Sequence, residues 1–404
     1  MELLRRSVSG ASLLMLLMAG QRLLTFGLNS LLIRSADAAT LGFAANDMEL
    51  LLSTLLFLSR ETFRIVALRQ AGTSQDGTKV NSDARITLLN LAWTPVVVGV
   101  AVSGLAAVGV VLYSPSSAEK RDTALLFCLA SAIESLAEPF FVLVQHDLLY
   151  HVRVGAEMAA TVAKCAATYG GVVYLQAGAK AFGYGQLMFA VVLLLWYASF
   201  FVVVRKEDSG LLPQWRAGDS VWTRWLPSST WRLLFAFVGQ SVFLHFLTEG
   251  DHVVLVLNSS AFDKGVYVVV TNYGSLAARL LFRPIEEATR ALMAKTLHVR
   301  PRETETSPPA VEPATVSHAA TVFCMVLRFV VLLGLLIVAL GPNYAYAAVH
   351  LLLGSRWSET AVPSTLGVYC VYILTCALNG VGEVRARILI MFSFVVLLVV
   401  VFLK

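Results

Sequence analysis

The chain has 404 residues, of which 57% are hydrophobic and only 14% charged. A soluble protein of this size carries roughly a quarter charged residues, so this composition excludes an ordinary soluble enzyme. The formal net charge is +5, but Lys and Arg fall mainly between apolar runs, which argues against a nucleic-acid partner. The apolar runs are about 20 residues long, enough for a helix to cross a ~30 Å hydrocarbon core. We therefore predict an all-α polytopic membrane protein.

About eleven membrane-spanning helices are predicted from the apolar runs. The first four, residues 8–33, 42–68, 86–113 and 123–145, are followed by 154–177, 183–204, 233–257, 265–293, 317–341, 363–382 and 388–403. Lys and Arg are enriched on one side of the resulting topology, which by the positive-inside rule places the N-terminus in the cytosol.

The first two spans carry arginines inside apolar sequence. Arg22 lies several residues into the first span, and Arg60 and Arg64 stack at four-residue spacing near the end of the second, with Glu61 beside Arg60. Arg22 has the alternative reading of a side chain that reaches the cytosolic interface. The alternative for the second group is an internally paired Arg–Glu helix end.

The fourth and fifth spans hold further charges. Glu134 and Glu138 share one face of the fourth span and precede Pro139, which can kink that helix. The fifth span carries Glu157 and Lys164 on one face. Buried charges in a membrane need partners, and we expect Glu134 or Glu138 to pair with Lys164 in a mainly structural role.

A polar connection over residues 205–231, rich in Trp and Arg, divides the chain and suits the cytosolic headgroup interface. The predicted domains are a six-helix N-terminal lobe (1–204), this interlobe loop (205–231) and a C-terminal lobe (232–404) that looks incomplete. The next span contains His245, Glu249, Asp251 and His252. Their spacing matches no specific metal motif, and a proton or cation relay is the open alternative.

The eighth predicted span is the most unusual, because it carries charged side chains on one ridge. Residues four apart stack on a helix, which aligns Arg279, Arg283 and Glu287, with Glu286 beside Arg283. A charge facing lipid at a helix centre costs at least ~2.5–3.5 kcal/mol. This ridge is therefore predicted to line a polar chamber, with Asn272 at the start of the same stretch.

A weak internal repeat relates the two halves: Leu56–Arg64 resembles Leu281–Arg290 if one gap is allowed. Two related lobes would bring both arginine ridges to a shared central cavity, as in transporters built from repeats. The fold expected is two pseudo-symmetric helical lobes around a central cavity, with the second lobe incomplete.

These motifs together resemble the Rft family. The matching stretches begin with RLLTFGLN (Arg22–Asn29), LFLSRETFR (Leu56–Arg64), AEPFFVLVQ (Ala137–Gln145) and AEMAATVAK (Ala156–Lys164), and continue with LTEGD (Leu247–Asp251), the block Gly265–Glu287 and ALNGVGE (Ala377–Glu383). The family belongs to the multidrug/oligosaccharidyl-lipid/polysaccharide exporter superfamily and is implicated in moving a dolichol-diphosphate heptasaccharide to the endoplasmic reticulum lumen. Its members usually continue through further helices, and this sequence departs from that pattern after Glu383.

The resemblance implies a multi-pass protein of the endoplasmic reticulum membrane that translocates a dolichol-diphosphate oligosaccharide for N-glycosylation. It implies a transporter rather than an enzyme, with no cofactor, no metal and no nucleic acid, and with membrane lipid and other N-glycosylation proteins as partners. The substrate-binding candidates are Arg22, Arg60, Arg64, Arg279 and Arg283, since guanidinium groups bind phosphate oxygens in pairs and stay charged. Polar cavity residues that would orient them are Glu61, Glu286, Glu287, Asn272 and Glu249.

Three other functions remain as alternatives. A membrane scaffold or chaperone of the same pathway would use the charges to hold helices together. An ion-coupled drug exporter would use Glu249 and Asp251, although the arginines disfavour cationic drugs. A glycosyltransferase lacks support, because no long loop presents an acidic metal–nucleotide cluster.

Overall fold

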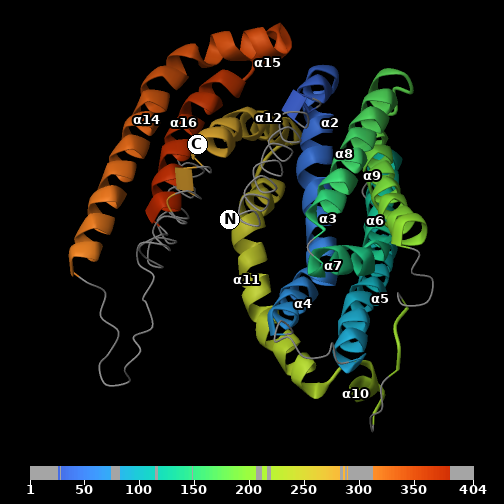
Figure 1. The fold of residues 1–404 in the computed structure, drawn as a ribbon. Helices are drawn as coiled ribbons and strands as arrows, with labels where there is room; N and C mark the ends of the chain where they lie inside the picture. The colour runs from blue at the N-terminus through green and yellow to red at the C-terminus, as the bar shows by residue number, and fades with distance from the viewer. Residues whose placement is uncertain are drawn as a thin grey trace. The chain divides into compact units, whose positions relative to one another are not determined.

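The computed structural model describes residues 26–27, 29–73, 82–113, 117–147, 149–205, 212–215, 220–282, 285–286, 289 and 313–382. Within these ranges every regular element is a helix and no strand occurs (Figure 1). This confirms the prediction of an all-α protein. The predicted first span lies mostly, and the last entirely, outside the described residues.

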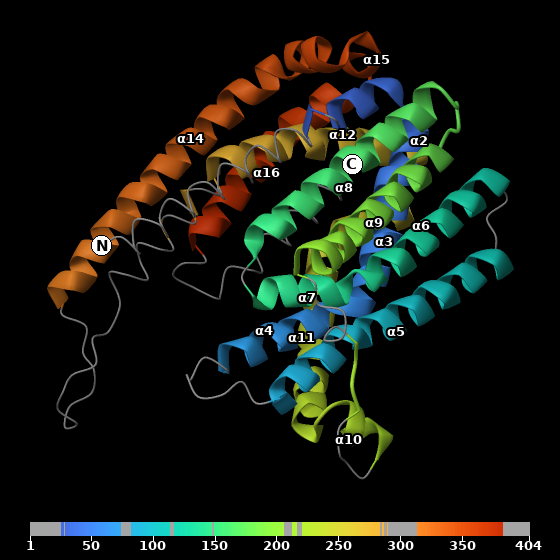
Figure 2. The same cartoon turned by 45° about the vertical axis from the view of Figure 1, so that its right-hand side comes forward.

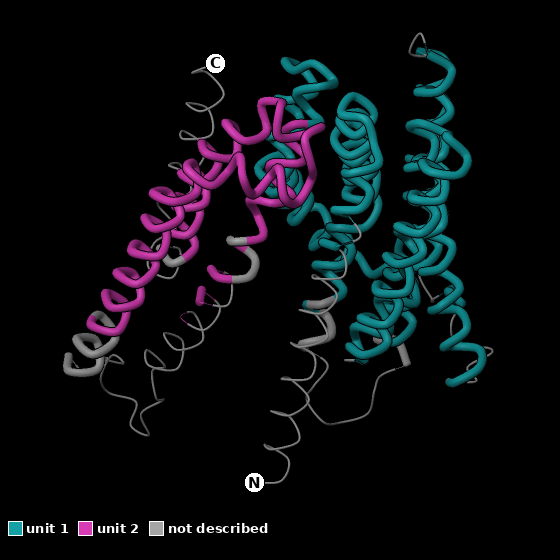
Figure 3. The backbone as a smooth tube through the Cα atoms, turned by 90° about the horizontal axis from the view of Figure 1, so that it is seen from above, with its two compact units in different colours: residues 1–265 teal, residues 266–404 magenta. Residues whose placement is uncertain are grey.

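The chain divides into two compact units, Met1–Gly265 and Val266–Lys404 (Figure 3). The first contains α2 (Ala38–Gly42), η1 (Phe43–Asp47), α3 (Met48–Leu56), η2 (Phe57–Glu61), α4 (Thr62–Thr73), α5 (Ser82–Leu112), α6 (Ala118–Leu136), α7 (Glu138–His146), α8 (Tyr150–Val173), α9 (Lys180–Ser199), η3 (Phe200–Arg205), α10 (Val221–Trp225) and α11 (Ser228–Asn258). Helix α12 (Ala261–Ala277) continues into the second unit, which contains η4 (Ala278–Phe282), α14 (Pro313–Leu353), α15 (Ser355–Ser358) and α16 (Val362–Gly382). The η elements are π-helical turns. The predicted lobe limits, 1–204 and 232–404, stay a prediction.

Six helical stretches among the described residues are long and apolar enough to cross a membrane: Ala38–Ala67, Arg85–Leu112, Lys180–Val204, Ser228–Asn258, Thr321–Leu353 and Val362–Gly380. The shortest has 19 residues, and at 1.5 Å per residue it reaches about 28 Å. All six coincide with predicted spans. Helix α8 covers the predicted span at 154–177 but is not among the six, since Arg153, Glu157 and Lys164 interrupt its apolar sequence.

The core of the first unit lies among long helices that run side by side. Helix α9 packs against both α8 and α6, and α6 packs against α5 (Figures 1 and 2). Tyr197 of α9 and Phe201 of η3 are fully buried in one apolar cluster together with Val66 of α4 and Val144 of α7. This packing fixes α4, α7 and α8 around one region of the unit.

Pro139 breaks the predicted fourth span. Helices α6 and α7 together form one apolar stretch, bent by 41° where they meet. Proline has no N–H to donate to the carbonyl of Ser135, so the helix cannot continue its regular hydrogen bonding there. The predicted kink is confirmed, and it places Glu134 and Glu138 on the two sides of the break.

A close helix crossing joins the start of the first unit to its end. A Cβ added at Gly42 would lie 2.1 Å from the carbonyl oxygen of Ala261, and one added at Gly265 would lie 2.1 Å from that of Ala38. Only glycine allows backbones this close. Beside the crossing, Lys264 Nζ contacts Asp47 Oδ1 at 2.9 Å, with the lysine side chain 8% exposed.

The polar connection before α11 is anchored to the helices of the first unit. The Nδ2 amide of Asn90, a fully buried residue of α5, donates to the carbonyls of Gln214 and Trp225 at 2.7 and 2.8 Å. Its Oδ1 accepts from the backbone N–H of Gln214 at 2.9 Å. One amide side chain therefore satisfies three backbone groups of the connection.

In the second unit, α14 and α16 pack along each other (Figure 1). Glycines of α14 face side chains of α16: a Cβ at Gly334 would lie 2.3 Å from Leu374 Cδ1, and one at Gly341 would lie 2.3 Å from Cys370 Sγ. Small residues at such contacts let membrane helices approach closely.

Candidate functional site

The broken helix α6–α7 supplies two buried carboxylates to the interior of the first unit. Glu134 is 4% exposed and Glu138 is 2% exposed. A buried carboxylate is strongly unfavourable unless it is paired and hydrogen-bonded. The residues that pair with these two carboxylates are therefore central to the site.

Two arginines from η2 and α4 bind both carboxylates. Arg60 Nη1 lies 2.7 Å from Glu134 Oε1 and 3.2 Å from Glu138 Oε1. Arg64 donates from Nε to Glu138 Oε2 at 2.8 Å, and its Nη2 bonds the other oxygen of the same carboxylate. The guanidinium of Arg64 therefore holds Glu138 in a bidentate pair, the strongest geometry for this type of contact.

The π-helical turn η2 ends at Glu61, one residue after Arg60. Such turns inside α-helices are often found at functional sites. Here the turn lies immediately before α4, which carries Arg64, and the four-residue spacing seen in the sequence brings both guanidiniums to the carboxylate of Glu138.

A third arginine, Arg153 near the start of α8, completes the cluster. Its Nε donates to Glu157 Oε1 at 2.9 Å and its Nη1 to Gln145 Oε1 at 3.0 Å. Its guanidinium carbon is 5.0 Å from the centre of the Phe141 ring, and that of Arg64 is 3.9 Å from the same centre. Phe141 of α7 thus lies against two cations.

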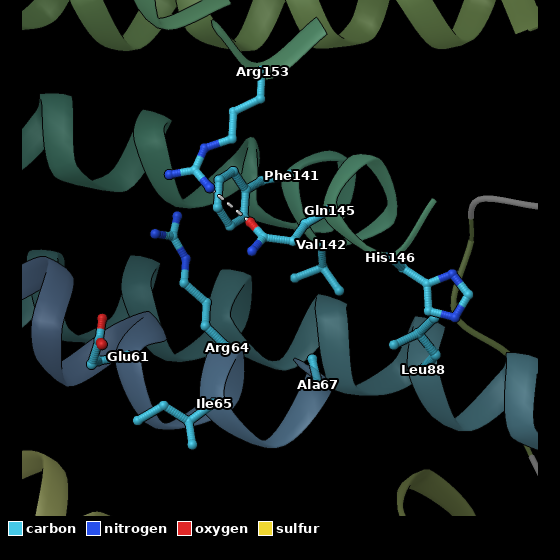
Figure 4. Close-up of a pocket in the computed structure, with 10 residues that line it drawn as sticks. All are labelled: Glu61, Arg64, Ile65, Ala67, Leu88, Phe141, Val142, Gln145, His146 and Arg153. Carbon is cyan, nitrogen blue, oxygen red and sulfur yellow. Dashed lines mark hydrogen bonds between the residues drawn. The ribbon is translucent and has the colours of Figure 1, made fainter. Parts of the chain in front are cut away.

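Two cavities, of about 200 and 210 Å³, meet at this cluster and share Arg64 and Phe141 in their walls. The first is drawn in Figure 4 and also contains Glu61, Gln145 and Arg153. The second is lined by Arg60, Arg64, Glu134, Phe141, Glu157, Thr161, Phe189, Leu193 and Tyr197. Guanidinium groups that reach such cavities can bind phosphate or carboxylate oxygens.

The charges of the cluster balance. Three guanidiniums meet three carboxylates, Glu134, Glu138 and Glu157. The arginine side chains remain 19% (Arg60), 23% (Arg64) and 37% (Arg153) exposed. Each is therefore fixed by a carboxylate on one side while part of it is open to a cavity. An incoming anion would find oriented donors.

The predicted pairing with Lys164 is wrong. Lys164 Nζ lies 3.9 Å from Glu49 Oε2, a contact between partly exposed side chains, whereas Glu134 and Glu138 bind arginines. Seven residues separate Lys164 from Glu157, which corresponds to about 10 Å along the helix axis. Lys164 is not among the residues that line the cavity shared by Glu157 and Glu134, and its ammonium lies beside Glu49 of α3 instead.

Glu61 was expected to orient the arginines. It lines the first cavity, but in the described part of the chain the groups that hold Arg60 and Arg64 are Glu134 and Glu138. The cluster is therefore built across helices and is not an Arg–Glu pair within one helix end.

The remaining predicted residues are only partly described. Arg22, Arg283 and Glu287 lie outside the described residues, and for Arg279 only the backbone, in η4, is described. Asn272 is on α12, where its Nδ2 is buried with no hydrogen-bond partner among the described contacts. Glu286 lies against α16: a Cβ at Gly380 would come within 2.6 Å of its Oε2. A cavity shared by both arginine ridges stays a prediction.

The histidines of α11 make contacts within the first unit. His245 stacks on Phe57 with ring centres 4.2 Å apart and is 3.3 Å from Thr54 Oγ1. His252 Nδ1 is 2.7 Å from Asn46 Oδ1. Both side chains therefore tie α11 to the segment from η1 to η2, while Glu249 is half-buried on the same helix.

Sequence reasoning missed Arg153, Gln145 and Phe141. Arg153 falls between the predicted spans 123–145 and 154–177, where a basic residue indicates topology and not a site. The signal that could have found it is its four-residue spacing from Glu157, which marks a paired arginine at the start of a helix.

A profile of the Rft protein family matches residues 6–386. The chain is similar to three proteins named Man(5)GlcNAc(2)-PP-dolichol translocation protein RFT1: 31% identity for Yarrowia lipolytica, 33% for Mus musculus and 29% for Saccharomyces cerevisiae. These matches cover 94–95% of this chain, and the chain spans 61%, 71% and 72% of the respective relatives.

Among solved structures, the fold resembles an inward-facing multidrug resistance MATE family transporter of the MOP superfamily. The TM-score is 0.55 at 13% sequence identity, over 89% of this chain and 81% of that one. This likeness shows the helical fold alone. The family profile covers nearly the whole chain, and the chain therefore belongs to the Rft protein family.

Proposed function

We propose that this protein moves a dolichol-diphosphate oligosaccharide from the cytosolic to the lumenal leaflet of the endoplasmic reticulum membrane, where N-glycosylation uses it. Membership of the Rft family and the names of its relatives, which are dolichol-linked oligosaccharide translocation proteins, support this substrate. The apolar helices support a multi-pass membrane location. We further propose that the N-terminus is cytosolic, because Lys and Arg are enriched on that side of the predicted topology.

One observation carries the proposal: Arg60 and Arg64, both on the apolar stretch Ala38–Ala67, join Arg153 in a cluster that borders two cavities. Charged side chains within membrane segments mark substrate or ion pathways. A diphosphate joined to a sugar headgroup cannot cross hydrocarbon unaided, and guanidinium groups offer it paired donors that stay charged.

In the proposed mechanism, Arg60 and Arg64 contact the diphosphate, together with Arg22, Arg279 and Arg283. Glu134 and Glu138 hold the first two arginines while no substrate is bound. An arriving diphosphate competes with these carboxylates for the guanidiniums. Rocking of two helical bundles then carries the headgroup across while the polyprenyl tail stays in lipid. This mechanism involves no covalent chemistry.

A second candidate is a membrane scaffold for the same pathway that transports nothing. The observation that favours it is the full pairing of the arginines: Arg60 and Arg64 already bind Glu134 and Glu138. Such pairs can serve to hold helices together.

Reconstitution distinguishes the two candidates. Purified protein is placed in vesicles that contain a dolichol-diphosphate heptasaccharide, and the glycan accessible from outside is followed over time by capture with a lectin. Transport predicts that headgroups cross faster than in protein-free vesicles. A scaffold predicts equal rates in both, and that result would remove the transport proposal.

A further inference from the structure

Two guanidiniums from different helices converge on one aromatic ring. In Figure 4, Arg64 and Arg153 extend toward each other from opposite sides, with Phe141 beside both tips. Arg64 comes from α4, Phe141 from α7 and Arg153 from α8. The guanidinium carbons lie 3.9 and 5.0 Å from the ring centre.

This convergence is electrostatically unfavourable by itself, because two like charges approach each other in a partly buried site. Each charge has its own carboxylate, Glu138 for Arg64 and Glu157 for Arg153. The ring face attracts both cations and helps to hold them in place. A group that carries negative charge between the two tips would remove the remaining repulsion.

The size of the adjoining cavity restricts what that group can be. At about 200 Å³, it is below the roughly 300–1,000 Å³ of cavities that enclose drug-sized ligands. A glycan of seven sugars does not fit, but phosphate groups do. Because the second cavity adds Arg60 and shares Arg64, the two cavities together offer three guanidiniums to two linked phosphates.

We propose that Arg64 and Arg153 form a clamp for a diphosphate group, with Phe141 as its floor and Gln145 as the residue that positions Arg153. This inference rests on the proposed function only in assigning an isoprenoid tail to the ligand. The clamp itself requires only the diphosphate. Arg153, with a 37% exposed side chain, is the donor that the anion meets first.

The test is equilibrium binding to the purified full-length chain in detergent micelles with three radiolabelled probes: farnesyl diphosphate, farnesyl monophosphate and inorganic diphosphate. The variants are Arg153→Gln, Arg153→Lys and Glu157→Gln. Arg69→Gln is the matched control, because Arg69, like Arg153, stacks on a phenylalanine, Phe237 at 4.1 Å, but it lines neither cavity.

We expect Arg153→Gln to weaken farnesyl diphosphate binding by about tenfold or more, since a charge-assisted contact is lost. Arg153→Lys should recover only part of this loss, because an ammonium lacks the planar fork. The preference for diphosphate over monophosphate should shrink in Arg153→Gln. Glu157→Gln removes the carboxylate that competes with the diphosphate for Arg153. This variant should therefore bind farnesyl diphosphate at least as tightly as the unaltered protein does.

Unchanged diphosphate affinity in Arg153→Gln would overturn the clamp, and so would equal weakening by Arg153→Gln and Glu157→Gln, which would indicate a structural pair. If inorganic diphosphate binds as tightly as farnesyl diphosphate, the clamp recognises the free anion and not a lipid headgroup. If Arg153→Gln weakens farnesyl diphosphate binding while vesicles show no headgroup crossing, the clamp is supported and the proposed transport function is refuted.

Discussion

Glu138 is the residue whose loss should most disturb the arginine cluster. It is 2% exposed and accepts hydrogen bonds from both Arg60 and Arg64. The substitution Glu138→Gln keeps the shape of the side chain but removes its charge. Arg60 retains Glu134, whereas Arg64 loses its bidentate partner and becomes an unpaired charge inside the bundle.

Breaking a buried ion pair by removal of one partner costs ~3–5 kcal/mol. Because the Arg64 side chain is 23% exposed to a cavity, the lower end applies. We therefore expect Glu138→Gln to reduce the free energy of unfolding by about 3 kcal/mol. The measurement is equilibrium unfolding in detergent micelles, followed by tryptophan fluorescence and circular dichroism.

Two further variants separate charge from packing. Glu49→Gln alters a carboxylate that is 50% exposed and 3.9 Å from Lys164, and we expect a loss of at most about 0.5 kcal/mol. The double variant Glu138→Gln with Arg64→Gln restores neutrality and should recover more than half of the stability lost by Glu138→Gln alone. If the free energy of unfolding of Glu138→Gln lies within about 0.5 kcal/mol of that of the unaltered protein, the reasoning is refuted.

Three other predictions concern the first unit. Gly42→Ala should destabilise by about 1–3 kcal/mol because its Cβ would meet a backbone carbonyl at 2.1 Å, whereas Gly104→Ala, with nothing within 4 Å, should not; thermal unfolding compares the two. Lys264→Met leaves Asp47 without its cationic partner and should cost about 3 kcal/mol, and a second change of Asp47 to Asn should recover much of this in the same measurement. Asn90→Leu leaves three backbone groups of the connection before α11 without partners, so limited proteolysis there should become several-fold faster, and an unchanged rate would contradict the anchoring role.

Much of the fold follows from the sequence because the bilayer imposes simple rules. Apolar runs of sufficient length must become helices, and the described spans coincide with the predicted ones. The break at Pro139 also follows from local chemistry, since a proline cannot donate the hydrogen bond that the helix needs.

The pairing of charges could not be derived in the same way. The sequence indicated that Glu134 and Glu138 needed cationic partners, but several cations were available, and the choice depends on how far along each helix the charges lie. The 41° break and the packing of α4, α7 and α8 decide this, and both are tertiary features. Arg153 could not be identified from the sequence, because an arginine near a helix end can either set the membrane topology or bind a ligand. Only the residues that surround it in the fold distinguish these two roles.

The central claim is that the guanidiniums between α4, α7 and α8 act on the headgroup during its crossing. The most direct measurement is the initial rate of heptasaccharide crossing in vesicles for Arg60→Gln and Arg64→Gln, with Arg69→Gln as the matched control and equal amounts of folded protein. The account predicts that both cluster variants lose at least about tenfold in rate while Arg69→Gln retains it. Rates equal to that of the unaltered protein in both cluster variants would contradict the account.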